Sequence, residues 1–203
     1  KMNDDGNRYS FNNTTDTHMM KNSEWAIVAY LSQSKYGKLG NTNFIGSNKE
    51  VYQNKSNQYI TGCSYGSPSN GNTDYGCQYT YDNNIRTEDG MTGKGVGAST
   101  TGTIYGVYDM SGGAWEYVMG NYNDIAASSG FSEPLTLESK YYDKYTSNNV
   151  ALACNGSECL SHGLSETVGW YNDYRNMVSE EYPWLVRGGG FNSGNSGVFH
   201  FAD

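Results

Sequence analysis

The long stretch from residue 38 to residue 103 has little hydrophobic periodicity and many turn-forming residues. A segment of this length without regular elements is uncommon in a compact domain, and where it occurs it usually forms functional or covalently linked loops. The rest of the chain offers only a few short periodic segments. We therefore expect an irregular, loop-rich α+β fold with two helices and short antiparallel strands, in a single domain over residues 1–203.

The four cysteines form two local pairs in sequence rich in Gly, Asn and Ser, and we expect two disulfides: Cys63 with Cys77, and Cys154 with Cys159. Zinc binding is the competing interpretation, but the spacings are not those of two CxxC knuckles. Four free buried thiols are the remaining alternative. Disulfides would place the chain in an oxidising, extracytoplasmic setting.

A first helix is predicted to begin at Asn22 or Ser23, either of which can cap it, and to end near the basic turn and glycine of residues 35–37. One stripe of this helix carries residues that we expect to be buried: Trp25, Val28, Ala29 and Ser32. A second, shorter helix is predicted from about residue 165 to residue 178, with Leu164, Val168, Tyr171 and Met177 near one face.

Two segments have the character of strands. Residues 104–119 show short alternation that Gly112 and Gly113 interrupt, and residues 184–187 form an apolar run that leads into three glycines. We expect the second segment to be a buried strand.

The charge of the chain argues against several classes of partner. The net charge is −8, from 21 Asp and Glu against 13 Lys and Arg, and no basic run occurs. Nucleic acids and anionic membranes are bound through clustered Lys and Arg, so neither is an expected partner. No apolar stretch approaches the roughly 20 residues of a membrane helix. No signal peptide is visible, and we expect a fragment or a mature ectodomain.

Neutral polar and aromatic residues dominate instead, with 26 Gly and 19 Tyr. This mixture is too aromatic for a disordered chain. It is also the mixture that antibody paratopes use, because Tyr supplies rigid amphipathic contact area and Gly, Ser and Asn supply adaptable loops. The composition indicates a loop-rich binding surface.

Three stretches resemble signatures of the formylglycine-generating-enzyme family. Residues 106–117, GVYDMSGGAWEY, are similar to the family pattern GLYDMxGNVWEW, and residues 185–193, LVRGGGFNS, are similar to LRGGSWxS. Residues 22–30, NSEWAIVAY, resemble its helix EAEWEYAAR. The resemblance implies a C-type lectin fold, although the expected first strand (WVGKYEVT) and last strand (SFRVVL) are missing.

Within these motifs we expect structural roles more often than ligand contacts. Trp115 and Tyr117, two residues apart on a strand, would face the same side and fill the core. Arg187 can thread its guanidinium into a ring of backbone carbonyls or pair with a carboxylate such as Glu116. The expected structural scaffold is Trp115, Glu116, Arg187, Gly188 and Gly189.

A narrower resemblance is to retroelement-diversified bacterial surface or pilin-linked proteins with this fold, in which fixed scaffold residues alternate with variable ones near the C-terminus. It implies a shallow ligand-binding face. The residues that look variable are Gly190, Phe191, Asn192, Ser193, Asn195, His200, Ala202 and Asp203. On this face Phe191 would anchor a partner, and His200, if exposed, would add pH sensitivity.

Catalysis finds little support in the residues. The family's enzymes use a reactive cysteine pair in the C-terminal part of the domain, and no cysteine follows Cys159. No carboxylate pair, Ser nucleophile motif or phosphate-binding loop has the required spacing. We predict no catalytic residues and no cofactor.

A calcium ion is a weaker possibility, because Asn121, Asn123 and Asp124 offer oxygen ligands suited to a hard cation. They do not form an EF-hand pattern, and an Asn-rich turn is the simpler interpretation.

The sequence thus predicts a non-catalytic extracellular module that binds a protein or glycan ligand on a cell or phage surface. The resemblance implies a bacterial, pilus-associated protein. Two alternatives stay open: an uncharacterised enzyme on the same fold, or a self-assembling component of a pilus or surface layer.

Overall fold

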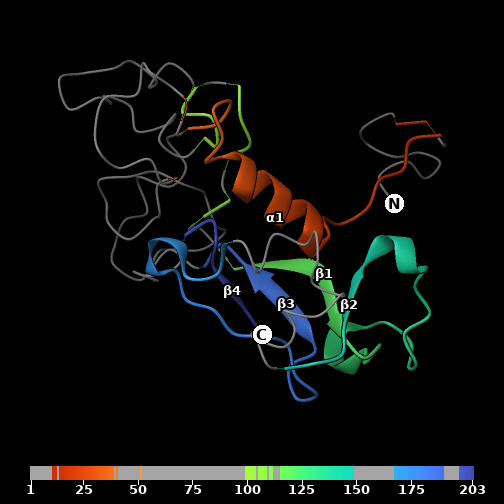
Figure 1. The fold of residues 1–203 in the computed structure, drawn as a ribbon. Helices are drawn as coiled ribbons and strands as arrows, with labels where there is room; N and C mark the ends of the chain where they lie inside the picture. Colours follow the sequence, from red (N-terminus) through yellow and green to blue (C-terminus); the bar gives the residue numbers. More distant parts are fainter. Residues whose placement is uncertain are drawn as a thin grey trace, which may run out of the picture.

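The computed structural model describes residues 11–12, 14–38, 40, 51, 99–103, 105–108, 110–111, 115–148, 167–189 and 197–203. Within these residues the protein is a small α+β structure with one α-helix and a four-stranded mixed sheet (Figure 1). The elements are α1 (Asn22–Leu31), β1 (Glu116–Tyr122), β2 (Asp143–Tyr145), β3 (Trp184–Arg187) and β4 (Phe201–Ala202). Three short 3-10 turns accompany them: η3 (Ala127–Ser129), η4 (Ser139–Tyr141) and η5 (Trp170–Asn172).

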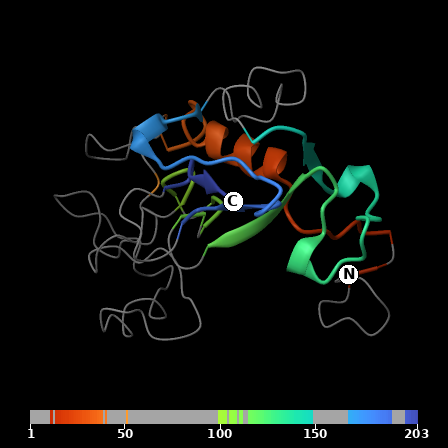
Figure 2. The same ribbon diagram turned by 90° about the horizontal axis from the view of Figure 1, so that it is seen from below.

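The strand order is β2-β1-β3-β4. β1 runs parallel to β2 and antiparallel to β3, and β3 runs antiparallel to β4. The central pair β1–β3 joins segments far apart in sequence. β4 pairs with β3 at the edge of the sheet and both its residues are buried, and Figure 2 shows the C-terminus beside this dark blue strand.

Helix α1 begins at Asn22, one of the two predicted starting residues, but the residue at its N-cap is Lys21 and not Asn22 or Ser23. The Glu24 carboxylate accepts the backbone N–H of Lys21 at 2.8 Å, and Asp143 of β2 accepts the N–H of Ser23 at 2.6 Å. Two amides at the helix start, which the helix itself cannot satisfy, are thus bonded to acids, and acids are favourable at this end of the helix dipole.

The predicted end of the helix was too late. The helix ends at Leu31, and residues 32–38 form turns that bring Gly37 N–H to the Ser34 carbonyl. The Ser32 hydroxyl donates to the Ala29 carbonyl at 2.6 Å, and such local side-chain bonds compete with helix propagation. The buried stripe is confirmed for Trp25, Ala29 and Ser32.

The sheet has two faces of different character. Arg187 pairs in register with Glu116 on one side and with Phe201 on the other, and the Arg187 side chain reaches Asn22 of α1. Side chains alternate between faces along a strand, so Val186, with its partners Tyr117 and Ala202, lies on the face away from the helix.

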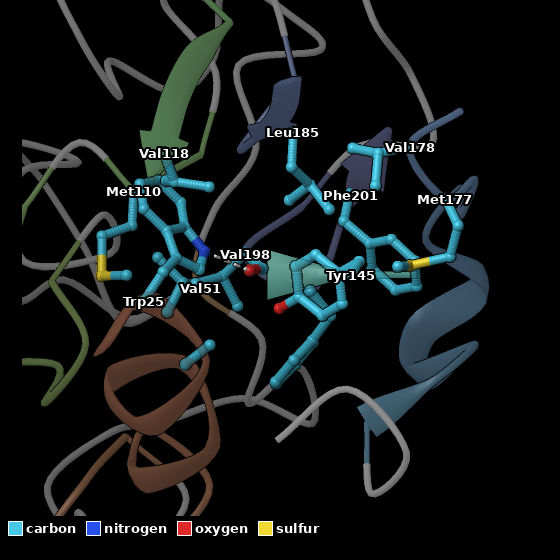
Figure 3. Packing of buried hydrophobic residues seen from close by; sticks show 12 residues of the cluster. Trp25, Val51, Met110, Val118, Tyr145, Met177, Val178, Leu185, Val198 and Phe201 are labelled. Carbon is cyan, nitrogen blue, oxygen red and sulfur yellow. Dashed lines mark hydrogen bonds between the residues drawn. The ribbon is translucent and has the colours of Figure 1, made fainter. Parts of the chain in front are cut away.

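The core lies between α1, the sheet and the segments that precede β3 and β4 (Figure 3). Its buried cluster consists of Trp25, Ala29, Val51, Met110, Val118, Tyr145, Met177, Val178, Leu185, Val198, Phe199 and Phe201. The Trp25 indole N–H donates to the Val198 carbonyl at 2.9 Å, shown as a dashed line in Figure 3. A large core side chain thus also satisfies its polar atom, as a buried Trp must.

The second predicted helix is wrong from residue 168 to residue 178, whereas Thr167 is helical. Gly169 has φ of +75°, Tyr171 φ of +56° and Asn172 φ of +62°, all in the left-handed region. An α-helix cannot continue through such residues, so the 3-10 turn η5 follows, and the chain becomes extended at Asp173. Met177 and Val178 are buried, but they lie outside any helix or strand.

Two further expectations have different outcomes. Trp184–Arg187 is a strand, as predicted, with its last three residues buried. Trp115 and Tyr117 do not fill the core, because their exposed fractions are 44% and 65%.

The four cysteines of the predicted disulfides, at positions 63, 77, 154 and 159, lie outside the described residues. In the part of the chain that the structure describes, no helix is long and apolar enough to cross a membrane.

Candidate functional site

A groove with a volume of about 630 Å³ is formed where β1, β3 and the end of β4 meet the turns around them. Its lining is dominated by aromatic and other apolar side chains. The lining residues are Met19, Tyr117, Val118, Met119, Ala127, Ser128, Ser129, Phe131, Glu181, Tyr182, Pro183, Trp184 and Asp203. This is the size and composition range of ordinary small-ligand sites in proteins.

The sheet explains why these side chains meet. Tyr117 of β1 pairs with Val186 of β3, and two positions earlier on β3 stands Trp184, which therefore shares the face of Val186. Asp203 directly follows Ala202, the β4 partner of Val186. Strands β1 and β3, together with the residue that follows β4, thus contribute to one groove.

Several aromatic rings of the groove are unusually open to solvent. The exposed fractions are 65% for Tyr117, 55% for Tyr182 and 41% for Phe131. Large exposed apolar side chains that gather in one place mark interaction sites, whereas single ones need no explanation. Met19, at 52%, extends the same surface.

Trp184 is the fixed element of the groove. Its indole N–H donates to the Ala126 carbonyl at 3.0 Å, and its ring lies 5.6 Å from the Phe131 ring between centroids. A ring held by a hydrogen bond and a neighbouring ring loses little further freedom when a ligand stacks on it.

The charged lining residues are both acids. Glu181 is exposed at the rim, and the carboxylate of Asp203 accepts a hydrogen bond from the Asn176 amide at 2.6 Å. Among the residues that the structure describes, no Lys, Arg or His lines the groove. The groove can therefore offer aromatic faces and carboxylate oxygens to a ligand, without a compensating positive side chain in its own wall.

The predicted ligand-binding residues divide into three groups. Gly190, Phe191, Asn192, Ser193 and Asn195 lie outside the described residues. Asp203 lines the groove. His200 and Ala202 are buried, with exposed fractions of 0% and 4%, which corrects the expectation that their side chains stand on an open face.

His200 is enclosed by two aromatic rings. The Trp115 ring meets it edge-on at 4.8 Å and the Tyr174 ring stacks at 5.7 Å. Neither imidazole nitrogen has a hydrogen-bond partner among the described residues. Burial, together with the positive charge of Arg187, lowers the pKa of His200 to about 4, so the ring is neutral at physiological pH.

Arg187 anchors the chain that follows the predicted variable stretch. Its Nη1 donates to the carbonyls of Phe199 and His200 at 3.4 and 3.2 Å, and its Nε donates to the Asn22 side chain at 2.8 Å. The expectation of a guanidinium among backbone carbonyls is confirmed. Glu116, its register partner across the sheet, is exposed.

Asp173, which the sequence did not single out, completes this anchor. Its carboxylate accepts the backbone N–H groups of Gly197 at 2.9 Å and Phe199 at 3.0 Å. Burial raises the pKa of Asp173 to about 6, although these N–H bonds and the nearby Arg187 act in the opposite direction. Asp173, Arg187 and Trp25 together hold residues 197–200. The contact of Arg187 with backbone carbonyls was predicted from the sequence, whereas the role of Asp173 and the Trp25–Val198 hydrogen bond were not.

The scaffold glycines have a conformational reason. Gly188 and Gly189 have φ of +75° and +66°, and a Cβ on Gly188 would lie 2.9 Å from the Met110 carbonyl oxygen. Both the backbone angle and the space therefore require glycine directly after β3.

Of the calcium candidates, Asn121 lies in β1, and Asn123 and Asp124 lie in the turn that follows, where the acid is already paired with a cation. Asn123 and Asp124 have positive φ, and the Asp124 carboxylate binds the Tyr142 hydroxyl at 2.6 Å and the Lys144 ammonium at 2.5 Å. The Asn121 amide donates to the Ile125 carbonyl. A side-chain ammonium on Asp124 disfavours a metal ion at the same oxygens. Within the described ranges no group of three or more His, Cys, Asp or Glu is placed to hold a metal.

Sequence reasoning missed most of the groove because it assigned Tyr117 to the core and singled out no residue in 127–131 or 181–183. Alternation along Trp184–Arg187 carried a usable signal: Leu185 and Arg187 share one face, so Trp184 and Val186 must share the other. Which of the two faces stays open depends on α1, and that is a tertiary property.

The three stretches that carried the family resemblance meet in space: Asn22 bonds Arg187, and Arg187 pairs in register with Glu116. Comparison with protein-family models, with curated proteins and with solved structures finds no match to this chain.

Proposed function

We propose that this protein is a non-catalytic ligand-binding module, displayed outside the bacterial cell, and that the groove between β1, β3 and Asp203 is part of its binding face. The observation that carries the proposal is the gathering of Tyr117, Phe131 and Tyr182, all more than 40% exposed, around a fixed Trp184. Tyr and Trp are favoured in binding surfaces, because they supply large contact area at low cost in conformational entropy.

The proposal includes the C-type lectin fold of the formylglycine-generating-enzyme kind. It is supported by the convergence of the three resembling stretches on one buried cluster, in which Asn22 bridges Arg187 and the Tyr145 hydroxyl. Motifs that are distant in sequence and meet at one point act as a scaffold, which is the role that the resemblance implies for them.

The proposal also includes a variable stretch at residues 190–195. It is supported by the residues on either side of that stretch. Gly189 follows a central strand, and Gly197 is bonded to Asp173. A rigid scaffold that carries binding residues on connecting segments is a common arrangement, because the scaffold tolerates changes in the segments.

The test of the binding site is a pair of variants in a ligand screen. Purified protein is screened against a glycan array and a displayed peptide library, and each hit is repeated with the double variant Tyr117→Ser/Phe131→Ser. We expect hits that lose at least about tenfold in affinity in the variant, while the Tm changes little because both side chains are exposed.

The matched control is Tyr105→Ser, which removes a tyrosine that is 82% exposed and does not line the groove. Hits that Tyr105→Ser weakens as much as the double variant would show general stickiness of exposed aromatics and overturn the site. Concentration-dependent self-association that the double variant abolishes would instead support the assembly alternative.

Diversification is tested on the gene. Sequencing the 3′ end across a clonal population, with its genomic neighbourhood, should show substitutions confined to the codons of the variable-looking residues, beside a near-identical template copy and a reverse transcriptase. A uniform 3′ end without a template would leave an undiversified binding module.

A further inference from the structure

We infer that the groove binds a positively charged group, an ammonium or a guanidinium, as carried by a Lys or Arg side chain on a partner protein. This inference rests on the proposed function and specifies the chemistry of its ligand.

The charge of the groove is the first reason. Glu181 and Asp203 line the groove, and no basic side chain of the described ranges lines it beside them. The nearest sequence neighbours of Asp203 in the described chain are apolar or neutral: Phe201 and Ala202 are buried, and His200 is uncharged. A cation entering the groove would find two carboxylates without an internal counter-charge, and the net charge of −8 would attract it from a distance.

The aromatic faces are the second reason. A cation over an aromatic ring is attracted by the negative face of the ring, most strongly for Trp and then for Tyr and Phe. The groove presents all three types, in Trp184, Tyr117 and Phe131. Trp184 is oriented in advance by its bond to Ala126 and by its contact with Phe131.

The apolar remainder fits the stem of the same side chain. Lys and Arg carry three or four methylene groups before the charge, and these groups bury readily against apolar surface while the charge stays hydrated or paired. Met19, Met119 and Pro183 line the groove together with the rings. A neutral apolar side chain would use this surface but not the acids, and a phosphate would be repelled by them.

The test measures binding at Trp184 directly. The chain has four Trp residues, and each indole N–H gives its own signal in a ¹H–¹⁵N spectrum; the signal missing in Trp184→Phe is that of Trp184. The intact protein is titrated with three blocked tripeptides, Gly-Lys-Gly, Gly-Arg-Gly and Gly-norleucine-Gly, where norleucine has the stem of Lys without its charge. The signal of Trp25, buried on Val198, is the internal control and should not move.

We expect the Lys and Arg peptides to shift the Trp184 signal saturably, at least about fivefold more tightly than the norleucine peptide. Added salt should weaken only the charged peptides. Glu181→Gln/Asp203→Asn should weaken binding of the Lys and Arg peptides and leave the affinity of the norleucine peptide unchanged. Glu138→Gln, which removes an exposed acid outside the groove, should leave all three affinities unchanged.

Two results would overturn the inference. Equal affinity for the norleucine and Lys peptides would show an apolar site, and the proposed function would stand. A Trp184 signal that no peptide moves, in a protein whose array hits still depend on Tyr117 and Phe131, would show that the groove binds neutral ligands such as glycans. If the wild-type protein gave no hits in the glycan and peptide screens, the proposed function itself would have failed.

Discussion

The carboxylate of Asp173 and the backbone amide of Gly197 are joined by a hydrogen bond of 2.9 Å. The same carboxylate also binds the amide of Phe199, so one buried acid fixes the chain at the point where it re-enters the core before β4. Because β4 pairs with β3 and precedes Asp203, this acid indirectly positions one wall of the groove.

The pH dependence of the stability should reveal Asp173. Its pKa is about 6 in the folded protein against an ordinary value of 3.8, so the folded state binds the proton more tightly. The stability from this group is fully present below about pH 4 and is lost as pH rises through about 6, by about 3 kcal/mol at most, at 1.36 kcal/mol per pKa unit. Urea unfolding of wild type and Asp173→Asn from pH 4 to 7 should give a stability difference that decreases with rising pH. A difference that grows with pH would contradict a pKa of Asp173 that is higher in the folded protein than its ordinary value.

His200 should have the opposite dependence. Its pKa is lowered from 6.5 to about 4, so the unfolded state binds the proton more tightly between these values. The stability from this group is present above about pH 6.5 and is lost as pH falls towards 4, again by about 3 kcal/mol at most. Between about pH 4 and 6 Asp173 and His200 have opposite effects on the free energy of unfolding. The stability of the wild type should therefore change less with pH than the stability of either single variant.

The matching variant is His200→Phe, which keeps a ring between Trp115 and Tyr174 and removes two buried nitrogens without partners in the described structure. Relative to wild type it should gain stability as pH falls from 6.5 to 4, in the same urea experiment. No pH-dependent gain would mean that His200 is solvated in solution.

These two residues also show where prediction from sequence stops. The strand Trp184–Arg187, the start of α1 at Asn22 and the carbonyl-bound Arg187 follow from local pattern and chemistry, and they were predicted. Whether His200 is exposed, or whether an ordinary-looking Asp173 is buried, depends on which segments cover it. Left-handed residues such as Tyr171 ended the second predicted helix, although apolar spacing favoured one.

The groove illustrates the same limit. Alternation determines that Tyr117 and Val118 point to opposite faces, but α1 determines which face is covered. Tyr117 was assigned to the core because an aromatic residue on a strand is usually buried there. Its 65% exposure is therefore a departure from the ordinary pattern, and such departures are expected at functional surfaces.

Arg187 should be indispensable for folding. Replacing it with Met keeps much of its volume but removes the donors to the Asn22 side chain and to the Phe199 and His200 carbonyls, which would remain buried. We expect a loss of about 3 kcal/mol or more in the free energy of unfolding. Lys should not rescue it, because one ammonium cannot reproduce the forked geometry. Thermal unfolding followed by circular dichroism decides the question, and a variant within about 1 kcal/mol of wild type would show that the cluster is replaceable.

Two glycines with similar backbone angles separate the cost of strain from the cost of crowding. Gly130 has φ of +86° and open space where a Cβ would stand, whereas Gly188 has φ of +75° and the Met110 carbonyl oxygen at 2.9 Å from that position. Gly130→Ala should therefore cost only the strain of a left-handed alanine, about 1 kcal/mol. Gly188→Ala adds a contact that real Cβ atoms rarely make, against backbone that cannot rotate away, and also presses on the Trp25 ring at 3.4 Å. We expect it to cost at least about 2 kcal/mol more than Gly130→Ala by urea unfolding. Equal costs for the two variants would mean that the turn after β3 can shift away from Met110, and that the glycine there serves its backbone angle alone.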